Sequence, residues 1–194
     1  RDVVFVPVGL AYDRVLEDRI LTDAAAAGSR RFRGKPLAIA GFVARVIWRK
    51  LRGTFRGFGT AAAAFGPPVS LAAFLAERPD RPVDDLGAHL MAAIEQVVPV
   101  LPVPLIAAAL AGQPGSRADL AEAVAGLITR LEAGGAVLKL PPQGMAATIA
   151  EGLEPLVGRG LVSPDLQRLP GSAALLAFYA SPVWQRLGVD SDPA

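Results

Sequence analysis

Cysteine is absent from this 194-residue chain, and histidine occurs once, as His89. Without cysteine the chain can form neither a disulfide nor a thiolate or cysteine-rich zinc site, and nothing argues for an oxidising compartment. A metal site around His89 would lack a second histidine and a suitably spaced acid. We therefore expect no metal centre and no resident cofactor.

Long apolar segments are also missing. A long uncharged segment, residues 96–113, is interrupted by Pro99, Pro102 and Pro104. It is marginal in length against the roughly 20 residues that a membrane-spanning helix needs, so we expect it to be buried or interfacial. The N-terminus lacks the pattern of a signal peptide, which favours a cytoplasmic setting. Hydrophobic residues make up 52% of the chain, and we expect them to form a core.

Acidic residues are absent between Arg30 and Arg56, although the whole chain has a formal net charge of only +2. Within this segment Arg45, Arg49 and Arg52 share one face of a helix expected from Pro36 to about residue 51. We interpret that face as a contact for an anionic membrane surface or a phosphate, with a solvated helix face as the alternative. Aromatic side chains that could anchor it in a lipid interface stand nearby: Phe42, Trp48 and Phe55.

The N-terminal segment carries the most informative pattern. Residues 3–9 form an apolar run that is broken by Pro7 and ends in Gly9, which predicts a buried strand. The exit of this strand carries three side chains able to hold a polar ligand, namely Tyr12, Asp13 and Arg14. A second strand is predicted near residues 60–65, between Phe58-Gly59-Thr60 and the sequence Phe65-Gly66-Pro67-Pro68-Val69-Ser70-Leu71.

These two segments, in this order, resemble the fourth motif and the last strand of the glycerol-3-phosphate acyltransferases, membrane-associated enzymes that begin phospholipid synthesis. The resemblance implies that glycerol 3-phosphate and an acyl-CoA or acyl carrier protein thioester are the substrates. It implies a peripheral enzyme at the cytoplasmic face of the bacterial inner membrane. The residues that it places at the substrate site are Val6, Pro7, Val8, Tyr12, Asp13 and Arg14. Asp13 and Arg14 could instead pair with each other and tie the loop.

The family's His-x4-Asp dyad and its two phosphate loops, which precede the fourth motif, are missing. His89 has Ile94 where the dyad needs an acid, and we expect this histidine to be a partly buried structural residue. We therefore interpret the chain as the C-terminal part of a longer enzyme, inactive by itself and without catalytic residues. Many bacterial members carry Glu where Asp13 follows Tyr12, which indicates a divergent branch.

Two alternatives remain open. One is another glycerolipid or lysophospholipid acyltransferase, and the other is a non-catalytic helical module for membrane adhesion or protein interaction. Nucleic acid is not expected as a partner, because residues 101–162 are slightly acidic. A bacterial source is suggested by abundant Ala, Gly and Pro and by arginine far outnumbering lysine.

The expected fold class is α/β. Residues 1–77 are predicted to supply the C-terminal part of a mixed acyltransferase sheet with its helices, and residues 78–194 a mainly α-helical domain. Ser70 is predicted to cap a helix through Ala76. Ser116, with Asp119 three residues later, is predicted to open another. Further helices are expected over residues 84–98, 104–111, 144–157 and, capped by Ser181 with Pro182 in its first turn, 182–187.

Overall fold

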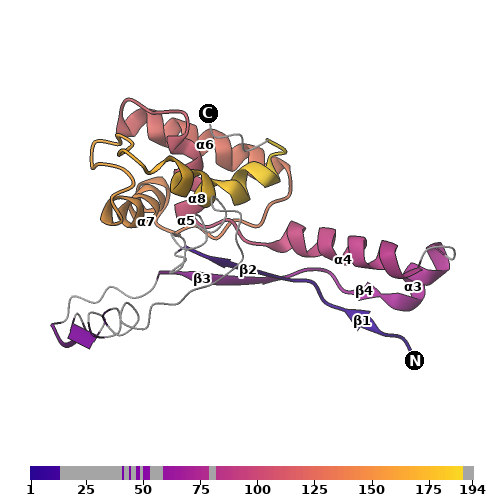
Figure 1. Ribbon diagram of the computed structural model, residues 1–194. Coiled ribbons are helices and arrows are strands. Elements are labelled where there is room, and N and C mark those ends of the chain that lie inside the picture. The colour runs from indigo at the N-terminus through magenta and orange to yellow at the C-terminus, as the bar shows by residue number, and fades with distance from the viewer. Residues whose placement is uncertain are drawn as a thin grey trace.

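The computed structural model describes residues 1–13, 41, 44, 47, 48, 50–52, 59–78 and 82–189, with only the backbone for residues 82–84. The described part combines two antiparallel two-stranded sheets with six labelled helices (Figure 1). Most of the helices lie in the C-terminal half. This confirms an α/β fold with a helical C-terminal part.

The strands form one long ribbon. Strand β1 (Val4–Phe5) pairs with β4 (Val69–Ser70), and β2 (Val8–Tyr12) pairs with β3 (Ala61–Phe65). Pro7 separates β1 from β2 because it has no N–H to donate to the ladder. Its carbonyl oxygen nevertheless accepts the N–H of Gly66 at 2.8 Å, so the two strand pairs continue into each other.

The two faces of the ribbon differ in side-chain size, because successive side chains of a strand point to opposite faces. The inner face of β2 and β3 carries only small residues, Gly9, Ala11, Ala62 and Ala64. The outer face is apolar and exposed, and its large members are Val4, Val6, Val8, Leu10, Tyr12 and Phe65. The prediction of a buried strand over residues 3–9 is therefore wrong for this outer face.

Helix α3 (Leu71–Glu77) begins at the cap that the sequence predicts. The Ser70 hydroxyl oxygen accepts the N–H of Ala73 at 3.1 Å, and the hydroxyl donates to the Asp2 carboxylate at 2.6 Å. The same carboxylate accepts the N–H of Ala72 at 2.9 Å. Asp2 and Ser70 together therefore satisfy two donors of the first turn.

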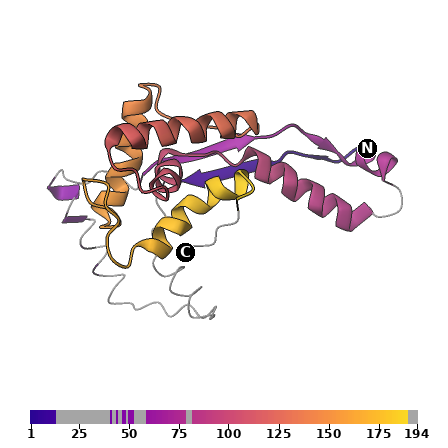
Figure 2. The same cartoon turned by 90° about the horizontal axis from the view of Figure 1, so that it is seen from above.

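Helix α4 (Pro82–Val97) runs beside the ribbon and packs against β2 at its C-terminal end (Figure 2). The approach is close because Gly9 has no side chain: a Cβ there would lie 2.6 Å from the carbonyl oxygen of Val97. The domain division that we predict at residue 77 coincides with the end of α3. It stays a prediction, since α4 lies beyond that point and contacts β2.

The hydrophobic core lies in a four-helix group that we call the helical unit. It comprises α5 (Pro102–Leu110), α6 (Arg117–Ala133), α7 (Met145–Gly158) and α8 (Ala173–Arg186). All nine residues of α5 are buried, and the other three helices pack around it. None of the helices in the described ranges is long and apolar enough to cross a membrane.

Two sequence predictions in this unit have different outcomes. Ser116 caps α6 as predicted, accepting the N–H of Asp119 at 3.1 Å. The last helix, in contrast, begins at Ala173, so a cap at Ser181 is wrong. Pro182 sits inside α8 and cannot donate to the carbonyl of Phe178, but the Ser181 hydroxyl donates to that oxygen at 2.9 Å. The helix therefore continues through the proline.

Candidate functional site

The exit of β2 carries the side chains that the sequence places at the substrate site. Tyr12 is 57% exposed, whereas Asp13 is 6% exposed and faces the opposite side of the ribbon. Val6 and Val8 are exposed with Tyr12, and Pro7 is buried on the side of Asp13. Arg14 lies outside the described residues. The alternation of the strand thus divides the described members of the motif between two faces.

Asp13 caps a helix that is remote in sequence. Its carboxylate accepts the N–H of Val103, in the first turn of α5, at 3.4 Å. Pro102 and Pro104 have no N–H, and Leu101 at the cap position makes no side-chain hydrogen bond. Val103 is therefore the one residue among the first three of α5 with an N–H to satisfy. A carboxylate there also suits the positive end of the helix dipole.

The surroundings of Asp13 oppose its ionisation. Burial raises the pKa of the Asp13 carboxyl above its ordinary value. Hydrogen bonds from Val103 and from Thr60 act in the other direction, and the negative charge of Glu151 adds to the increase in pKa. Perturbed acids are typical of functional sites, and they also occur where a carboxylate has a structural hydrogen-bonding role. The Asp13 geometry is that of a helix cap.

The segment that links α4 to α5, residues 95–103, is where the strands and the helical unit meet; we call it the junction. Arg186 of α8 donates to the carbonyl oxygens of Glu95, Gln96 and Val98, the last two at 2.8 Å. Glu95 and Gln96 lie in the last turn of α4 and Val98 follows it, where carbonyl oxygens lose the usual i+4 donors of a helix. Sequence analysis missed this role of Arg186, because its partners lie about ninety residues away.

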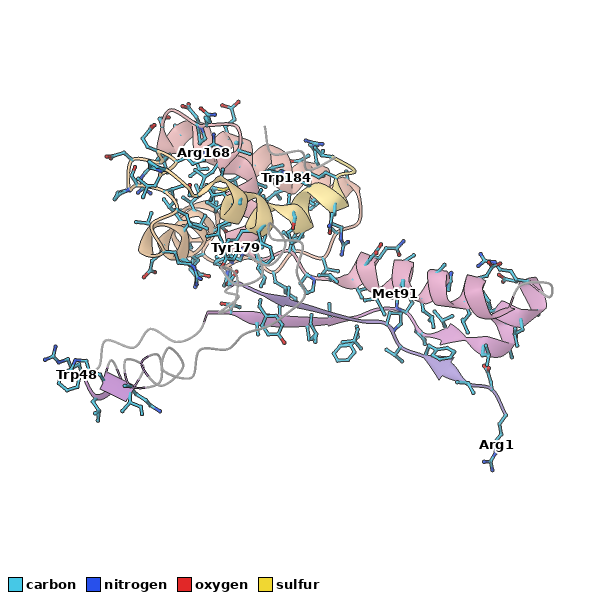
Figure 3. All side chains as sticks on the ribbon, viewed as in Figure 1. Arg1, Trp48, Met91, Arg168, Tyr179 and Trp184 are labelled. Atoms are coloured by element: carbon cyan, nitrogen blue, oxygen red, sulfur yellow. The ribbon has the colours of Figure 1, made fainter. Side chains whose placement is uncertain are left out.

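The basic segment contributes a small exposed surface, which we call the cationic tip: Ile47, Trp48, Lys50, Leu51 and Arg52 (Figure 3). The guanidinium carbon of Arg52 lies 4.5 Å from the centre of the Trp48 ring, within the range of a cation–π contact. Leu51 is 78% exposed. Arg45 and Arg49, with the aromatic residues Phe42 and Phe55, lie outside the described residues.

A comparison with protein-family models identifies the family of the chain. The family model "Glycerol-3-phosphate acyltransferase C-terminal region" matches residues 45–180, more than two thirds of the chain. The chain belongs to this family. The match begins after β2 and includes β3 and most of the helical unit, so it is independent of the motif at Tyr12. No curated protein matches the chain.

Membership in the glycerol-3-phosphate acyltransferase family confirms the resemblance. The family implies glycerol 3-phosphate and an acyl donor as substrates, and it is membrane-associated. His89, the one histidine of this acyltransferase region, is exposed on α4, and its ring centre lies 5.4 Å from that of Phe74. Our expectation that His89 is partly buried is therefore wrong: its ring lies beside that of Phe74 but is exposed.

Two hollows of the acyltransferase region lie away from the exit of β2. One of about 610 Å³ is lined by residues of α4 and α8, including Glu95 and Arg186. Another of about 290 Å³ lies between Gln113 and Leu166. Of the residues that the sequence places at the substrate site, none of those described here (Val6, Pro7, Val8, Tyr12 and Asp13) lines either hollow. Among the described residues, no group of His, Asp and Glu could hold a metal ion.

Proposed function

We propose that this chain is part of a glycerol-3-phosphate 1-O-acyltransferase. The enzyme would transfer an acyl group from acyl-CoA or an acyl carrier protein thioester to glycerol 3-phosphate. Membership in the family supports this assignment most directly. The fourth-motif residues at the exit of β2 support it independently, because Tyr12 is presented to solvent there.

Chemistry in this proposal depends on a group that the chain does not supply. Acyl transfer needs a base to take the proton of the glycerol hydroxyl as it attacks the thioester carbonyl, and the thiol leaves. His89 lies eight residues before the C-terminal end of α4, about 12 Å from that end along the helix axis. It has no acidic partner at the dyad spacing. The proposal therefore assigns the base to the region that carries the His-x4-Asp dyad.

The uncovered face of the ribbon supports such a division. A sheet face that is exposed to water normally carries polar side chains. The outer face here carries large apolar side chains instead. Phe65, opposite Val8, is 73% exposed. Apolar surface of this kind indicates a covering partner. The proposed partner is the catalytic region of the same enzyme, which makes the outer face of β2 a wall of the substrate cleft.

The cationic tip supports a peripheral membrane location. Trp48, Ile47 and Leu51 expose apolar surface next to the positive charges of Lys50 and Arg52. This combination suits the interface of an anionic bilayer, where each basic residue contributes about 1 kcal/mol. In the proposal the enzyme sits on the cytoplasmic face of the bacterial inner membrane.

Acyl transfer from labelled donors tests the proposal. We expect the chain by itself to show no transfer to glycerol 3-phosphate, and a complete enzyme with a dyad region joined before residue 1 to show it. Loss of general-base assistance alone is worth about 100- to 10,000-fold. Turnover by the isolated chain would contradict its assignment as a part without a base. Transfer by the complete enzyme to lysophospholipid but not to glycerol 3-phosphate would favour the alternative acyltransferase.

A further inference from the structure

We infer that Asp13 is a positioning residue through which the helical unit holds the exit of β2, so that the Tyr12 side chain keeps one direction. The inference rests on the proposed function, because it concerns how the substrate-facing motif is oriented. It assigns the helical unit a role in the acyltransferase beyond contributing a core.

Three contacts tie the end of β2 to the junction and to β3. Gly9 approaches the backbone of Val97 so closely that a Cβ would meet its carbonyl oxygen at 2.6 Å. Four residues further on, Asp13 accepts the N–H of Val103. The backbone N–H of Asp13 donates to the carbonyl of Thr60 at 2.9 Å. Strand β2 is thus fixed near its start at Gly9 and just after its end at Asp13.

The other side of the junction is held by the helical unit itself. The guanidinium of Arg186 binds carbonyl oxygens of residues 95, 96 and 98. The backbone of Val100 donates to Val137 at 2.8 Å and accepts from Lys139 at 3.0 Å. The junction therefore cannot move with β2 independently of α8. A displacement of α8 would shift residues 98–103 and, with them, the backbone N–H that Asp13 binds.

Asp13 and Tyr12 lie on opposite faces of the ribbon, which explains how a contact made by Asp13 would affect the proposed substrate site at Tyr12. Asp13 faces α5 and is buried, so it is not available to a substrate at the outer face. Tyr12, its neighbour, is exposed. Holding the Asp13 carboxylate against α5 therefore sets the direction of the Tyr12 side chain. Asn at position 13 keeps an acceptor oxygen for the Val103 N–H, whereas Leu removes it.

Hydrogen exchange of the full chain, measured by NMR, tests the positioning. We expect Asp13→Leu to speed hydrogen exchange of the backbone amide at position 13 at least tenfold. Exchange of the core amide of Leu120 should be unchanged. Asp13→Asn should stay within about threefold of the parent. Asp2→Leu is the matched control, since it removes a helix-capping carboxylate from α3 instead. Equal acceleration at both amides, or none at Asp13, would overturn the inference.

Kinetics of the complete acyltransferase provide a readout that a merely structural role would not move. Asp13→Leu should raise the KM for glycerol 3-phosphate about tenfold with a smaller change in kcat, and Asp13→Asn should restore it. Arg186→Lys, which cannot bind three carbonyls in one plane, should shift KM in the same direction. If the parent enzyme does not acylate glycerol 3-phosphate, the proposed function fails, whereas the exchange result still decides whether Asp13 holds β2. Unchanged KM in an active Asp13→Leu enzyme would reject the positioning role.

Discussion

The carboxylate of Asp13 lies 3.4 Å from the backbone nitrogen of Val103, ninety residues further along the chain. One hydrogen bond thus joins the end of β2 to α5, a helix whose nine residues are all buried. The bond exists because two prolines leave α5 with a single donor among its first three residues. Its consequences for stability depend on pH.

Asp13→Asn should change the pH dependence of stability in a defined direction. Burial raises the folded-state pKa of Asp13, so between the unfolded pKa and the folded pKa the folded chain binds more protons. The Asp13 contribution to stability is therefore largest below the unfolded pKa and falls as pH rises through that window. In urea unfolding at several pH values, the difference between parent and Asp13→Asn should show this fall.

Above the window, we expect Asp13→Asn to be as stable as the parent or more stable. Asp13→Ala loses the acceptor as well, and should lose about 1 to 2 kcal/mol relative to Asp13→Asn. The pKa of Asp2 is lowered by its hydrogen bonds to Ser70 and Ala72, so its contribution runs the other way and is lost at acid pH. A parent–variant difference that does not vary with pH would contradict the assignment of the slope to Asp13.

Gly9→Ala and Gly152→Ala should both destabilise the chain. A Cβ at Gly152 would lie 2.6 Å from the carbonyl oxygen of Pro102, where α7 crosses α5. Backbone atoms cannot give way as a flexible side chain can, so we expect a loss of about 3 kcal/mol for each change. Gly126→Ala is the control: it is exposed on α6 with open space around it, and should gain about 0.5 to 1 kcal/mol. Denaturant titrations that rank the three variants otherwise would contradict these close approaches.

Ser181→Ala should cost about 1 kcal/mol, since it leaves the Phe178 carbonyl without the hydroxyl that replaces the missing N–H of Pro182. In a Pro182→Ala background the restored N–H can take that carbonyl, and Ser181→Ala should become nearly neutral. The four variants form a thermodynamic cycle measured by thermal unfolding. Strict additivity would show that Ser181 does not compensate for the proline.

The outer face of the ribbon should bind an apolar-surface dye when the chain is isolated. Exposed side chains such as Leu10 and Phe65 offer a contiguous apolar face without a partner. Leu10→Thr with Phe65→Thr should reduce dye fluorescence and self-association while keeping β-propensity. Met91→Gln, on the exposed face of α4, is the control for an isolated apolar residue. Indifference of the parent chain to the dye would contradict an uncovered face.

Vesicle binding tests the basic segment. Replacing Arg45, Arg49 and Arg52 with Gln should weaken co-sedimentation with anionic vesicles, and salt should do the same as the Debye length shortens from about 10 Å at 0.1 M. Unfolding curves should barely change, because surface charges add little to stability. Trp48→Ala should weaken binding even at high salt, since its contribution is apolar. Equal binding to neutral and anionic vesicles would support the alternative interpretation, in which the arginines form a solvated helix face.

Features with a local cause could be predicted from the sequence alone. Ser70 and Ser116 cap helices because their partners lie three residues away. The strand at residues 61–65 was predicted from its resemblance to the family's last strand, since alanine is depleted in strands. Family membership was also accessible, because two short motifs in the right order carry it. The uncharged run over residues 96–113 was expected to be buried or interfacial, and its residues 102–110 are buried.

Only the tertiary structure decided the rest, because the deciding partners are distant in sequence. Local rules predict a helix start at Ser181-Pro182, but residues before it are packed in the core, and α8 continues through the proline. Strand alternation separates Tyr12 from Asp13, but which face is covered depends on where α4 and α5 pack. The roles of Asp13 and Arg186 are set by backbone groups some ninety residues away, and no local pattern encodes them.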